Sequence, residues 1–519
     1  MCGFLAKISK SKYHQNLLSK KEFECAAKEI SHRGPDFNST IHLDNGTSFA
    51  HYRLSIIDDS KSSDQPFISK CGRYILIFNG EIYNYKSLAN KYFPEILIKG
   101  DTDTLMLLLI NHDINKFLSE IEGMFSFVFF DKVTNNFLAA RDRFGIKPLY
   151  YFNDKNTIIL ASEPFPIAKI IKTNQDNVSL YEIECYRRPT PGFSYYTNVL
   201  ECLPGFFITN NKIERWTNSH RNFYNDTYSL DDLIDRLKYV FNLNTIADTP
   251  HTAFQSGGID SSLISYLTRP CSLYTVGMND NNEIDISRQI ASILDLDINT
   301  QIVQKEEFLN LLTEYLKIKK EPISVPNEVL IFKLCKTMKP FHKYFLTGEG
   351  ADEIFFGYDK IFKWANTFGK EISRISFLEL FLDKYSYSNK VHKGERFVNF
   401  CIRLFDNCES HLDFIEDFFL DFHLPGLLNR ADRASMAAGK EARVPFCSQT
   451  IVNYMYRRPF EIRIKNNQAK YPLNQILGKT KISFILSTPK IGFSTLIPGM
   501  DNKGTYKYML KFFNKLNLS

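Results

Sequence analysis

A turn rich in serine and glycine, Ser256–Ser262 (Ser-Gly-Gly-Ile-Asp-Ser-Ser), constrains the fold of the second half of this chain. It stands between a short extended segment and an apolar helix candidate, Leu263–Thr268. Further strands are predicted at Leu273–Val276 and Tyr344–Thr347, with helical patterns between them. Strands that alternate with helices form a parallel sheet covered on both faces. We therefore expect an α/β domain from about residue 228, becoming mostly helical from about Ile372.

The same turn has the composition of an anion-binding site. Glycines let the backbone approach a ligand closely, serines supply hydroxyl donors, and the following helix adds free N–H groups. Asp260 adds a carboxylate for Mg²⁺, an ion that prefers oxygen ligands together with phosphate. No Walker A pattern, G-x-x-x-x-G-K-[ST], occurs in the chain. The turn therefore predicts a phosphate site of another kind.

The first half of the chain has a different pattern. Short apolar and aromatic runs bounded by Gly, Asn and Asp predict stacked antiparallel sheets with few helices. These runs are Ser48–Ile57, Arg73–Phe78, Met124–Asp131, Phe137–Ala140 and a last strand near Phe206–Ile208. One helix is predicted at Thr104–His112, and asparagines gather after the last strand. We therefore predict domains at 1–208 and 229–519, joined by a linker at 209–228.

Charge and cysteine usage exclude several classes of protein. The formal net charge is +6, with lysines and arginines spread among acids and no nucleic-acid motif, so nucleic-acid binding is not expected. No apolar stretch is long enough to span a membrane. The ten cysteines lack C-x-x-C spacing, which is typical of reduced thiols in a cytosolic protein. A cytoplasmic enzyme that contacts neither membrane nor nucleic acid is the expectation.

Cys2 is a candidate nucleophile because removal of Met1 would place it at the N-terminus. It would then carry both a thiol and a free α-amino group. An α-amine titrates near neutrality, with a pKa of roughly 7.7–8.0, so it can accept the thiol proton. Activation by an N-terminal amine is an established route to amide hydrolysis.

Four further motifs follow Cys2, at His32–Asp36, His51–Ile56, Asn79–Asn84 and Arg141–Tyr150. With the Ser256–Ser262 turn, they make nearly the whole chain resemble glutamine-hydrolysing asparagine synthetases of the bacterial B type. The resemblance implies a class II glutamine amidotransferase domain, an αββα sandwich of the N-terminal-nucleophile fold. It also implies a parallel-sheet α/β ATP-pyrophosphatase domain with a helical C-terminal part, needing ATP and Mg²⁺.

For the first domain, the resemblance implies a glutaminase site. Cys2 would attack the side-chain amide of glutamine, giving a thioester and ammonia. Asn79 and Gly80 would supply the donors for the oxyanion. The glutamine-binding residues would be Arg53 on the carboxylate, Glu81 and Asp101 on the ammonium, together with Ile56.

For the second domain, the resemblance implies activation of a carboxylate as an adenylate, with release of AMP and pyrophosphate. Glu349 would assist formation and attack of the adenylate, Lys470 would neutralise phosphate charge, and Mg²⁺ would lie between Asp260 and Asp352. Arg430 is a candidate partner for an aspartate substrate, with a structural ion pair to Asp432 or Glu441 as the alternative. The nucleotide-binding residues would be Phe254, Ser256, Gly257, Gly258, Asp260, Ser261, Ser262, Val276, Thr347 and Gly348.

Several positions depart from the family pattern, and they cluster in the second domain. They are Gln255, Phe356, Cys447, Ser448, Pro472 and Asn474. Proline is unfavourable inside a helix by about 3 kcal/mol, so Pro472 within a helical pattern is unexpected. No departure removes a named catalytic group, but together they leave the identity of the acceptor open.

The first interpretation is an asparagine synthetase that uses aspartate, glutamine and ATP; the resemblance leaves a homodimer open. The second keeps both half-reactions but amidates another carboxylate, such as a uronic acid or a secondary-metabolite precursor. A lactam-forming cyclase relative needs no glutaminase, yet Cys2 is intact. The Ser256–Ser262 turn excludes the second domain of glucosamine- or purine-type amidotransferases. An inactive scaffold would lack Cys2, Asn79, Asp260 or Glu349, and all four are present.

Overall fold

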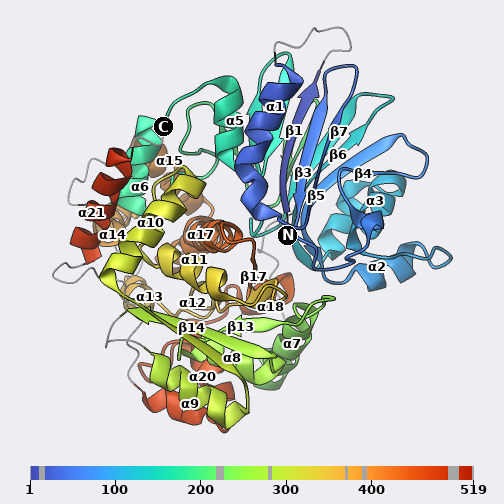
Figure 1. Cartoon of the computed structure of the whole chain (residues 1–519). Coiled ribbons are helices and arrows are strands. Elements are labelled where there is room, and N and C mark those ends of the chain that lie inside the picture. Colours follow the sequence, from blue (N-terminus) through green and yellow to red (C-terminus); the bar gives the residue numbers. More distant parts are fainter. Residues whose placement is uncertain are drawn as a thin grey trace.

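The computed structural model describes residues 2–10, 18–217, 227–278, 283–368, 372–388, 394–488 and 502–516. Its first half stacks two antiparallel sheets of six strands each (Figure 1). One sheet contains, in order, β10 (Leu200–Glu201), β8 (Tyr150–Asn153), β9 (Thr157–Ala161), β1 (Cys2–Ser9), β3 (Ser48–Arg53) and β2 (Phe37–His42). The other contains β12 (Ile213–Arg215), β11 (Phe206–Thr209), β7 (Asn136–Arg141), β6 (Gly123–Asp131), β5 (Tyr74–Ile82) and β4 (Phe67–Ile68).

Helices cover both outer faces of this stack, which confirms the predicted αββα layers (Figure 1). The helices of this half are α1 (Lys20–Ala27), α2 (Tyr85–Tyr92), α3 (Asp101–Asn111), α4 (Ile114–Phe117), α5 (Pro164–Ile171) and α6 (Asn177–Tyr186). The helix predicted at Thr104–His112 is present as part of α3, whereas the other helices of this half were not predicted one by one. A local signal marked α1, since Ser19 and Glu22 form a capping box. α5 likewise begins with Pro164 at a position that proline favours.

The second antiparallel sheet extends beyond the predicted domain boundary. Within the segment predicted as a linker, β12 pairs with β11, and Phe206 lies opposite Arg215. The side chain of Trp216 is buried and donates a hydrogen bond to the carbonyl of Arg141 (3.0 Å). The first unit therefore continues at least to Trp216, and residues 218–226 of the predicted linker lie outside the described residues.

The second half is built on a parallel sheet of five strands in the order β15-β14-β13-β16-β17. These are β15 (Ile298–Val303), β14 (Ser272–Met278), β13 (Thr252–Phe254), β16 (Tyr344–Leu346) and β17 (Glu441–Arg443). The strand order reverses between β13 and β16. In open α/β sheets, ligands bind at the carboxyl ends of the strands at this reversal. The Ser256–Ser262 turn follows β13, and Thr347 follows β16, so both predicted phosphate motifs stand there.

Helices cover both faces of the parallel sheet, as predicted (Figure 1). One face carries α7 (Leu230–Leu243), α8 (Ile259–Thr268), α9 (Ile284–Leu294) and α20 (Tyr471–Gly478). The other carries α10 (Lys305–Lys319), α11 (Asn327–Thr337) and α17 (Leu424–Met436). The remaining helices are α12 (Ala351–Ile354), α13 (Asp359–Asn366), α14 (Arg374–Tyr385), α15 (Glu395–Asp406), α16 (His411–Phe418), α18 (Gln449–Met455), α19 (Phe460–Arg463) and α21 (Asn502–Lys515).

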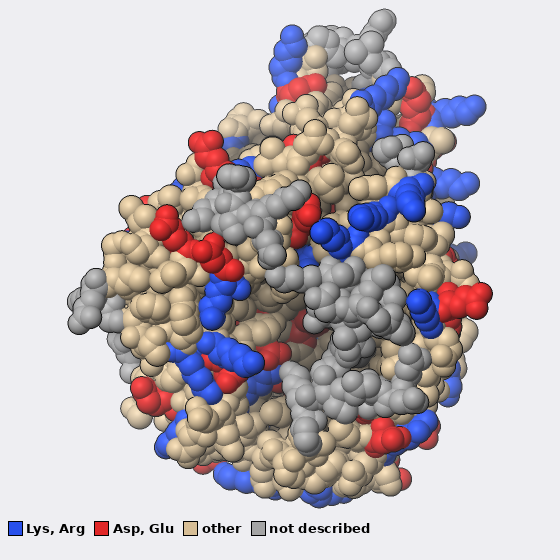
Figure 2. All heavy atoms as spheres, turned by 90° about the vertical axis from the view of Figure 1, so that its left-hand side faces the viewer, with Lys and Arg blue, Asp and Glu red and all other residues tan. Residues whose placement is uncertain are grey.

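The predicted helical C-terminal part packs around phenylalanines. Phe377, Phe381, Phe414 and Phe418 are all fully buried there, in one apolar cluster. None of the helices within the described ranges is long and apolar enough to cross a membrane. On the face shown in Figure 2, basic and acidic side chains are interspersed.

Candidate active sites

Cys2 begins β1 and is almost completely buried, with 6% of its surface exposed. Its backbone N–H donates to Asn79 Oδ1 (3.0 Å), and its carbonyl accepts from Arg33 Nε (3.1 Å). Burial raises the pKa of the Cys2 thiol above its ordinary value of 9.0. The thiol is therefore protonated at neutral pH, and nucleophilic attack requires a base that removes this proton.

Asn79 and Gly80 lie on β5 beside the nucleophile. Asn79 Oδ1 is fixed by the backbone of Cys2, whereas its Nδ2 is buried and has no hydrogen-bond partner among the described residues. A Cβ at position 80 would lie 2.0 Å from the carbonyl oxygen of Met124, so only glycine allows this approach of β5 to β6. A buried amide donor next to a thiol can stabilise a developing oxyanion.

Two acidic side chains lie close to Cys2 on the side that faces the second domain. Burial, together with Glu441 and Asp101, raises the pKa of Glu81 well above its ordinary value. Burial also raises the pKa of Asp101 to about 6, although its carboxylate accepts from the backbone N–H of Ile82 (3.1 Å). Buried carboxylates of this kind favour a cationic ligand, which would restore their ionised form.

Arg443 of β17 extends to the same carboxylates from the parallel sheet. Its Nη2 lies 3.9 Å from Glu81 Oε2, and its Nε lies 2.5 Å from Glu441 Oε1. Glu441 and Arg443 therefore lie at the glutaminase side, because β17 is an edge strand of the parallel sheet and Arg443 contacts Glu81 of the first domain.

The other two predicted glutamine contacts already have partners in this structure. Arg53 Nη1 contacts Asp64 Oδ1 (2.8 Å) and the carbonyl of Ser60 (3.0 Å), while its Nη2 contacts the carbonyl of Asp58. The carbonyl of Ile56 accepts from the backbone N–H of Asp248 (2.9 Å). These contacts use three of the five N–H donors of the Arg53 guanidinium.

The second site is a cavity of about 230 Å³ at the reversal point of the parallel sheet. Of the predicted residues, the cavity is lined by Phe254, Ser256, Asp260, Ser261, Val276, Thr347, Gly348, Glu349 and Asp352. The predicted residues Gly257, Gly258 and Lys470 line an adjoining cavity of about 250 Å³, which also contains Asp352. Ser262 is fully buried behind the turn and lines neither of these two cavities. Asp352 thus lies where the two cavities meet.

Asp260 and Asp352 converge on one cation, the ammonium of Lys470. Lys470 Nζ lies 2.6 Å from Asp260 Oδ2 and 2.7 Å from Asp352 Oδ1. Burial alone would lower the pKa of Lys470, but the two carboxylates raise it above its ordinary value. A Cβ at Gly357 would lie 1.8 Å from Asp352 Oδ1, so the chain leaves space beside this carboxylate.

The two aspartates fit Mg²⁺ bound together with phosphates. Across the described residues, no group of three or more His, Cys, Asp or Glu forms a metal site. Mg²⁺ is usually held by one or two carboxylates, with phosphate oxygens and waters completing its coordination. Two carboxylates already arranged around a cation at a phosphate-type turn match that donor set.

Arg430 of α17 forms an ion pair with Glu349 (2.7 Å). The predicted structural partners, Asp432 and Glu441, were therefore wrong. Arg430 is buried, and its Nε has no hydrogen-bond partner among the described residues. Glu349 lines this cavity, whereas Arg430 lines another cavity of about 50 Å³, so the pair connects the walls of the two.

Both halves of the chain match family models. Residues 1–224 match the glutamine amidotransferase domain family, and residues 233–516 match the asparagine synthase family. The chain belongs to the asparagine synthase family. It is 27% identical to asparagine synthetase [glutamine-hydrolyzing] 1 of Bacillus subtilis, over 95% of this chain and 87% of that protein. It is 29% identical to amidase chry2 of Gibberella zeae, over 65% of this chain and 55% of that protein.

A solved structure resembles part of the chain only weakly. It is the glutamine phosphoribosylpyrophosphate amidotransferase of B. subtilis, at a TM-score of 0.32 and 14% identity, over 58% of this chain and 65% of that one. The two family matches together make this chain a glutamine-hydrolysing ligase of the asparagine synthase family that carries out glutamine-dependent amidation. They confirm the resemblance inferred from the motifs.

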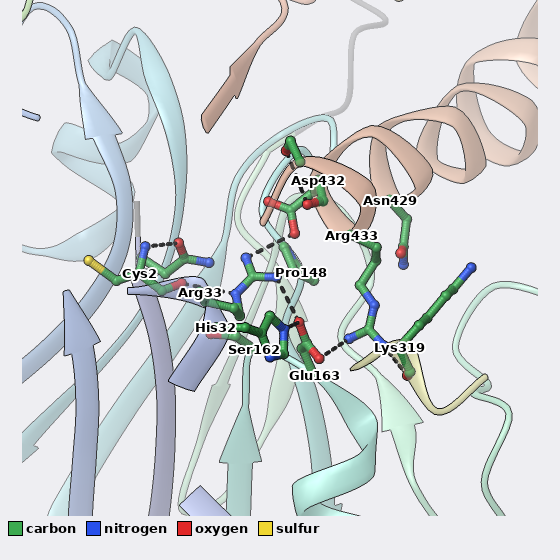
Figure 3. Close-up of polar contacts among 12 residues, drawn as sticks. Cys2, His32, Arg33, Pro148, Ser162, Glu163, Lys319, Asn429, Asp432 and Arg433 are labelled. Atoms are coloured by element: carbon green, nitrogen blue, oxygen red, sulfur yellow. Dashed lines mark hydrogen bonds and ion pairs between the residues drawn. The ribbon is translucent and has the colours of Figure 1, made fainter. Parts of the chain in front are cut away.

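An ion-pair network that the sequence did not reveal joins the two domains of this family member (Figure 3). Arg33, whose Nε contacts the carbonyl of Cys2, also contacts Glu163 (3.0 Å) and Asp432 of α17 (2.9 Å). Glu163 in turn contacts Arg433 of α17 (2.5 Å). These four side chains are almost completely buried, so the network ties the strand of the nucleophile to α17, the helix that also carries Arg430.

Glu163→Gln is expected to lower the free energy of unfolding by about 3–5 kcal/mol, because it removes the buried carboxylate that Arg33 and Arg433 share and leaves Arg33 with Asp432 alone. Glu120→Gln is the matched control, since its partner Lys91 is exposed and such pairs contribute about 0–1 kcal/mol. Urea denaturation of the two variants and the wild type measures both effects. Equal losses in the two variants would contradict a structural role for the network.

The structure accounts for several of the departures from the family pattern. Pro472 lies in the first turn of α20, where proline is tolerated. Phe356 adopts a left-handed φ of 57°, which glycine tolerates best, and its buried ring stacks on Phe362 at 3.8 Å. The family pattern has an aspartate at position 448. Ser448 donates to Glu122 of the first domain (3.1 Å), and an aspartate there would be repelled by that carboxylate. Cys447 contacts the carbonyl of Glu349 (3.7 Å).

Proposed function

We propose that this protein converts aspartate to asparagine, using ammonia from glutamine and energy from ATP, through an aspartyl adenylate. The observation that carries the proposal is that one chain combines a buried N-terminal-type cysteine site with a separate cavity containing a phosphate-type turn and paired aspartates. The products would be asparagine, glutamate, AMP and pyrophosphate.

At the first site, removal of Met1 would give Cys2 a free α-amine that takes the thiol proton. The thiolate would attack the glutamine amide, and Asn79 Nδ2 with the Gly80 N–H would hold the oxyanion. One such donor is worth roughly 2.7–4 kcal/mol of transition-state stabilisation. Ammonia would leave with the proton, and water would later hydrolyse the thioester.

At the second site, ATP would bind with its phosphates on the Ser256–Ser262 turn and its base near Phe254 and Val276. Bound Mg²⁺, held by Asp260 and Asp352, would neutralise charge on the phosphates during adenylation. Lys470 would stay in contact with the leaving pyrophosphate, since its ammonium already lies between the two aspartates. Glu349 would accept a proton from ammonia as it attacks the adenylate carbonyl.

The alternative acceptor is a carboxylate other than aspartate. It is considered because the chain is also similar to a protein of Gibberella zeae that is named as an amidase and not as an asparagine synthetase. In that alternative both half-reactions are kept, and another carboxylate takes the place of aspartate. Arg430 can contact a second carboxylate in either case, since its Nε has no partner among the described residues.

Pyrophosphate release from Mg-ATP and glutamine, measured with and without aspartate, tests this proposal. Strong dependence on aspartate, with asparagine as the product, is the expected result. Glutamine hydrolysis without any response to aspartate would contradict the proposed acceptor and favour the alternative.

The affinity for glutamine is expected to rise with pH through about 6, because ionised Asp101 would bind the substrate ammonium. Its folded pKa of about 6 lies above the ordinary value of 3.8, so the folded chain holds this proton more tightly than the unfolded chain. The protonated carboxyl of Asp101 therefore stabilises the folded chain at low pH. This contribution to the free energy of unfolding is lost as the pH rises through 6. Measuring kcat/KM for glutamine against pH checks the affinity effect. Asp101→Asn should remove the rise, whereas the control Asp103→Asn should keep it.

A further inference from the structure

Gln255, the residue immediately before the phosphate-type turn, has a buried side-chain amide whose nitrogen and oxygen both form hydrogen bonds. Gln255 has 1% of its surface exposed. Its backbone N–H donates to the carbonyl of Tyr274 (2.9 Å), which fixes it at the end of β13. A buried amide is unfavourable unless its side-chain donors and acceptor are satisfied. The partners of this side chain therefore indicate what it does.

All partners of the Gln255 side chain are serines of α8. Its Nε2 donates to Ser261 Oγ (3.1 Å) and to Ser262 Oγ (3.0 Å). Its Oε1 accepts from Ser265 Oγ (2.7 Å). An amide nitrogen can only donate, so both of its hydrogens are directed at hydroxyl oxygens of the turn.

These bonds determine the direction in which the Ser261 hydroxyl points its hydrogen. Ser261 Oγ accepts from Gln255 Nε2 and also from the backbone N–H of Ser256 (3.2 Å). A hydroxyl oxygen has two lone pairs, so this one has none left to accept with. Its hydrogen is left to the carbonyl of Gly258 or to Ser256 Oγ, each at 3.2 Å and so longer than a usual O–H···O bond.

Ser261 lines the cavity at the turn, whereas Ser262 lies behind it and donates to the same Gly258 carbonyl at 2.6 Å. We propose that Gln255 is a positioning residue that makes the Ser261 hydroxyl an obligate donor to a phosphate oxygen of the nucleotide. This inference rests on the proposed function, because it takes the ligand of the turn to be a nucleoside triphosphate. Gln255 also lines this cavity, but both hydrogens of its side-chain amide are directed at serine hydroxyls, so it acts through Ser261.

The dissociation constant for Mg-ATP in the full-length protein tests this, because it requires no acceptor. Gln255→Met keeps the length of the side chain but removes both donors, and it should weaken Mg-ATP binding about tenfold. Gln255→Glu should weaken it further, because a carboxylate would accept the Ser261 hydrogen and turn the lone pairs of the oxygen toward the phosphate. Thr252→Val is the matched control on β13, the strand that leads into the turn, since it removes a buried hydrogen bond to the carbonyl of Tyr344 (2.8 Å) that involves no residue of the turn.

A double-mutant cycle separates positioning from a merely structural role. In a Ser261→Ala background, Gln255→Met should have little further effect on Mg-ATP binding, because the two residues act as one unit. Equal weakening in both backgrounds would overturn the inference and leave the proposed function in place. A wild-type protein that binds no Mg-ATP would overturn both. Glutamine hydrolysis at Cys2 should be unchanged in every variant, and thermal unfolding followed by circular dichroism checks that the second domain, which carries the substitutions, is folded.

Discussion

Replacing Cys2 with alanine is expected to abolish amide formation from glutamine while leaving formation from free ammonia intact. The substitution removes the nucleophile, so glutamine hydrolysis should fall by at least about 10³-fold, as is usual when a covalent catalyst is lost. The second site lies on a separate sheet and does not use the thiol. Assays of product amide with glutamine or with ammonium chloride as the nitrogen source measure both activities.

Cys71→Ala is the matched control, because this thiol is exposed and lies away from the site. It should retain both activities. Full glutamine-dependent activity in Cys2→Ala would show that the N-terminal assignment is wrong. Loss of both activities would show instead that the cysteine is needed for the structure of the second domain.

Asp352→Asn is expected to lower pyrophosphate release from Mg-ATP by about 10²-fold or more while preserving glutamine hydrolysis. The change removes half of the carboxylate pair around Lys470 and the proposed Mg²⁺, and a bound metal contributes several kcal/mol to such reactions. Asp260→Asn should have a similar effect, because the two carboxylates contact the same cation. Pyrophosphate release at saturating Mg-ATP, with glutamine hydrolysis measured in parallel, checks the prediction.

Asp359→Asn is a suitable control, since this aspartate pairs with the partly exposed Lys363 on α13. It should leave pyrophosphate release within about twofold of the wild type. If Asp352→Asn behaved like this control, the aspartate pair would not be the metal site.

Local patterns predicted much of the fold. Short apolar and aromatic runs located β3, β5, β6 and β7, and the alternation of strands with helices after residue 228 located the parallel sheet. Helices α2 and α5 were missed because each is only eight residues long, and short helices carry little periodic signal. The strand β12 was missed because Ile213–Arg215 is exposed and lies among asparagines, which is typical of a linker.

The candidate sites were predicted where motifs are local in sequence. Ser256, Asp260 and Ser261 of the turn do line one cavity with Glu349, and Asn79 does lie at Cys2. Contacts between distant residues could not be predicted from one sequence, because no periodicity links Arg33 to Asp432. The partner of Arg430 could not be predicted either, because Glu349 lies 81 residues away in the sequence, whereas the predicted partners Asp432 and Glu441 lie close to it.

Isotope labelling tests whether nitrogen released from glutamine at the first site is transferred to the acceptor at the second. The enzyme would be incubated with Mg-ATP, aspartate and glutamine carrying ¹⁵N in its side-chain amide, and the amide of the product analysed by mass spectrometry. If nitrogen is transferred between the sites, the product is asparagine labelled with ¹⁵N in its side-chain amide, and one pyrophosphate is released for each amide formed. Release of labelled ammonia and glutamate, without ATP-dependent label in any product amide, would contradict it.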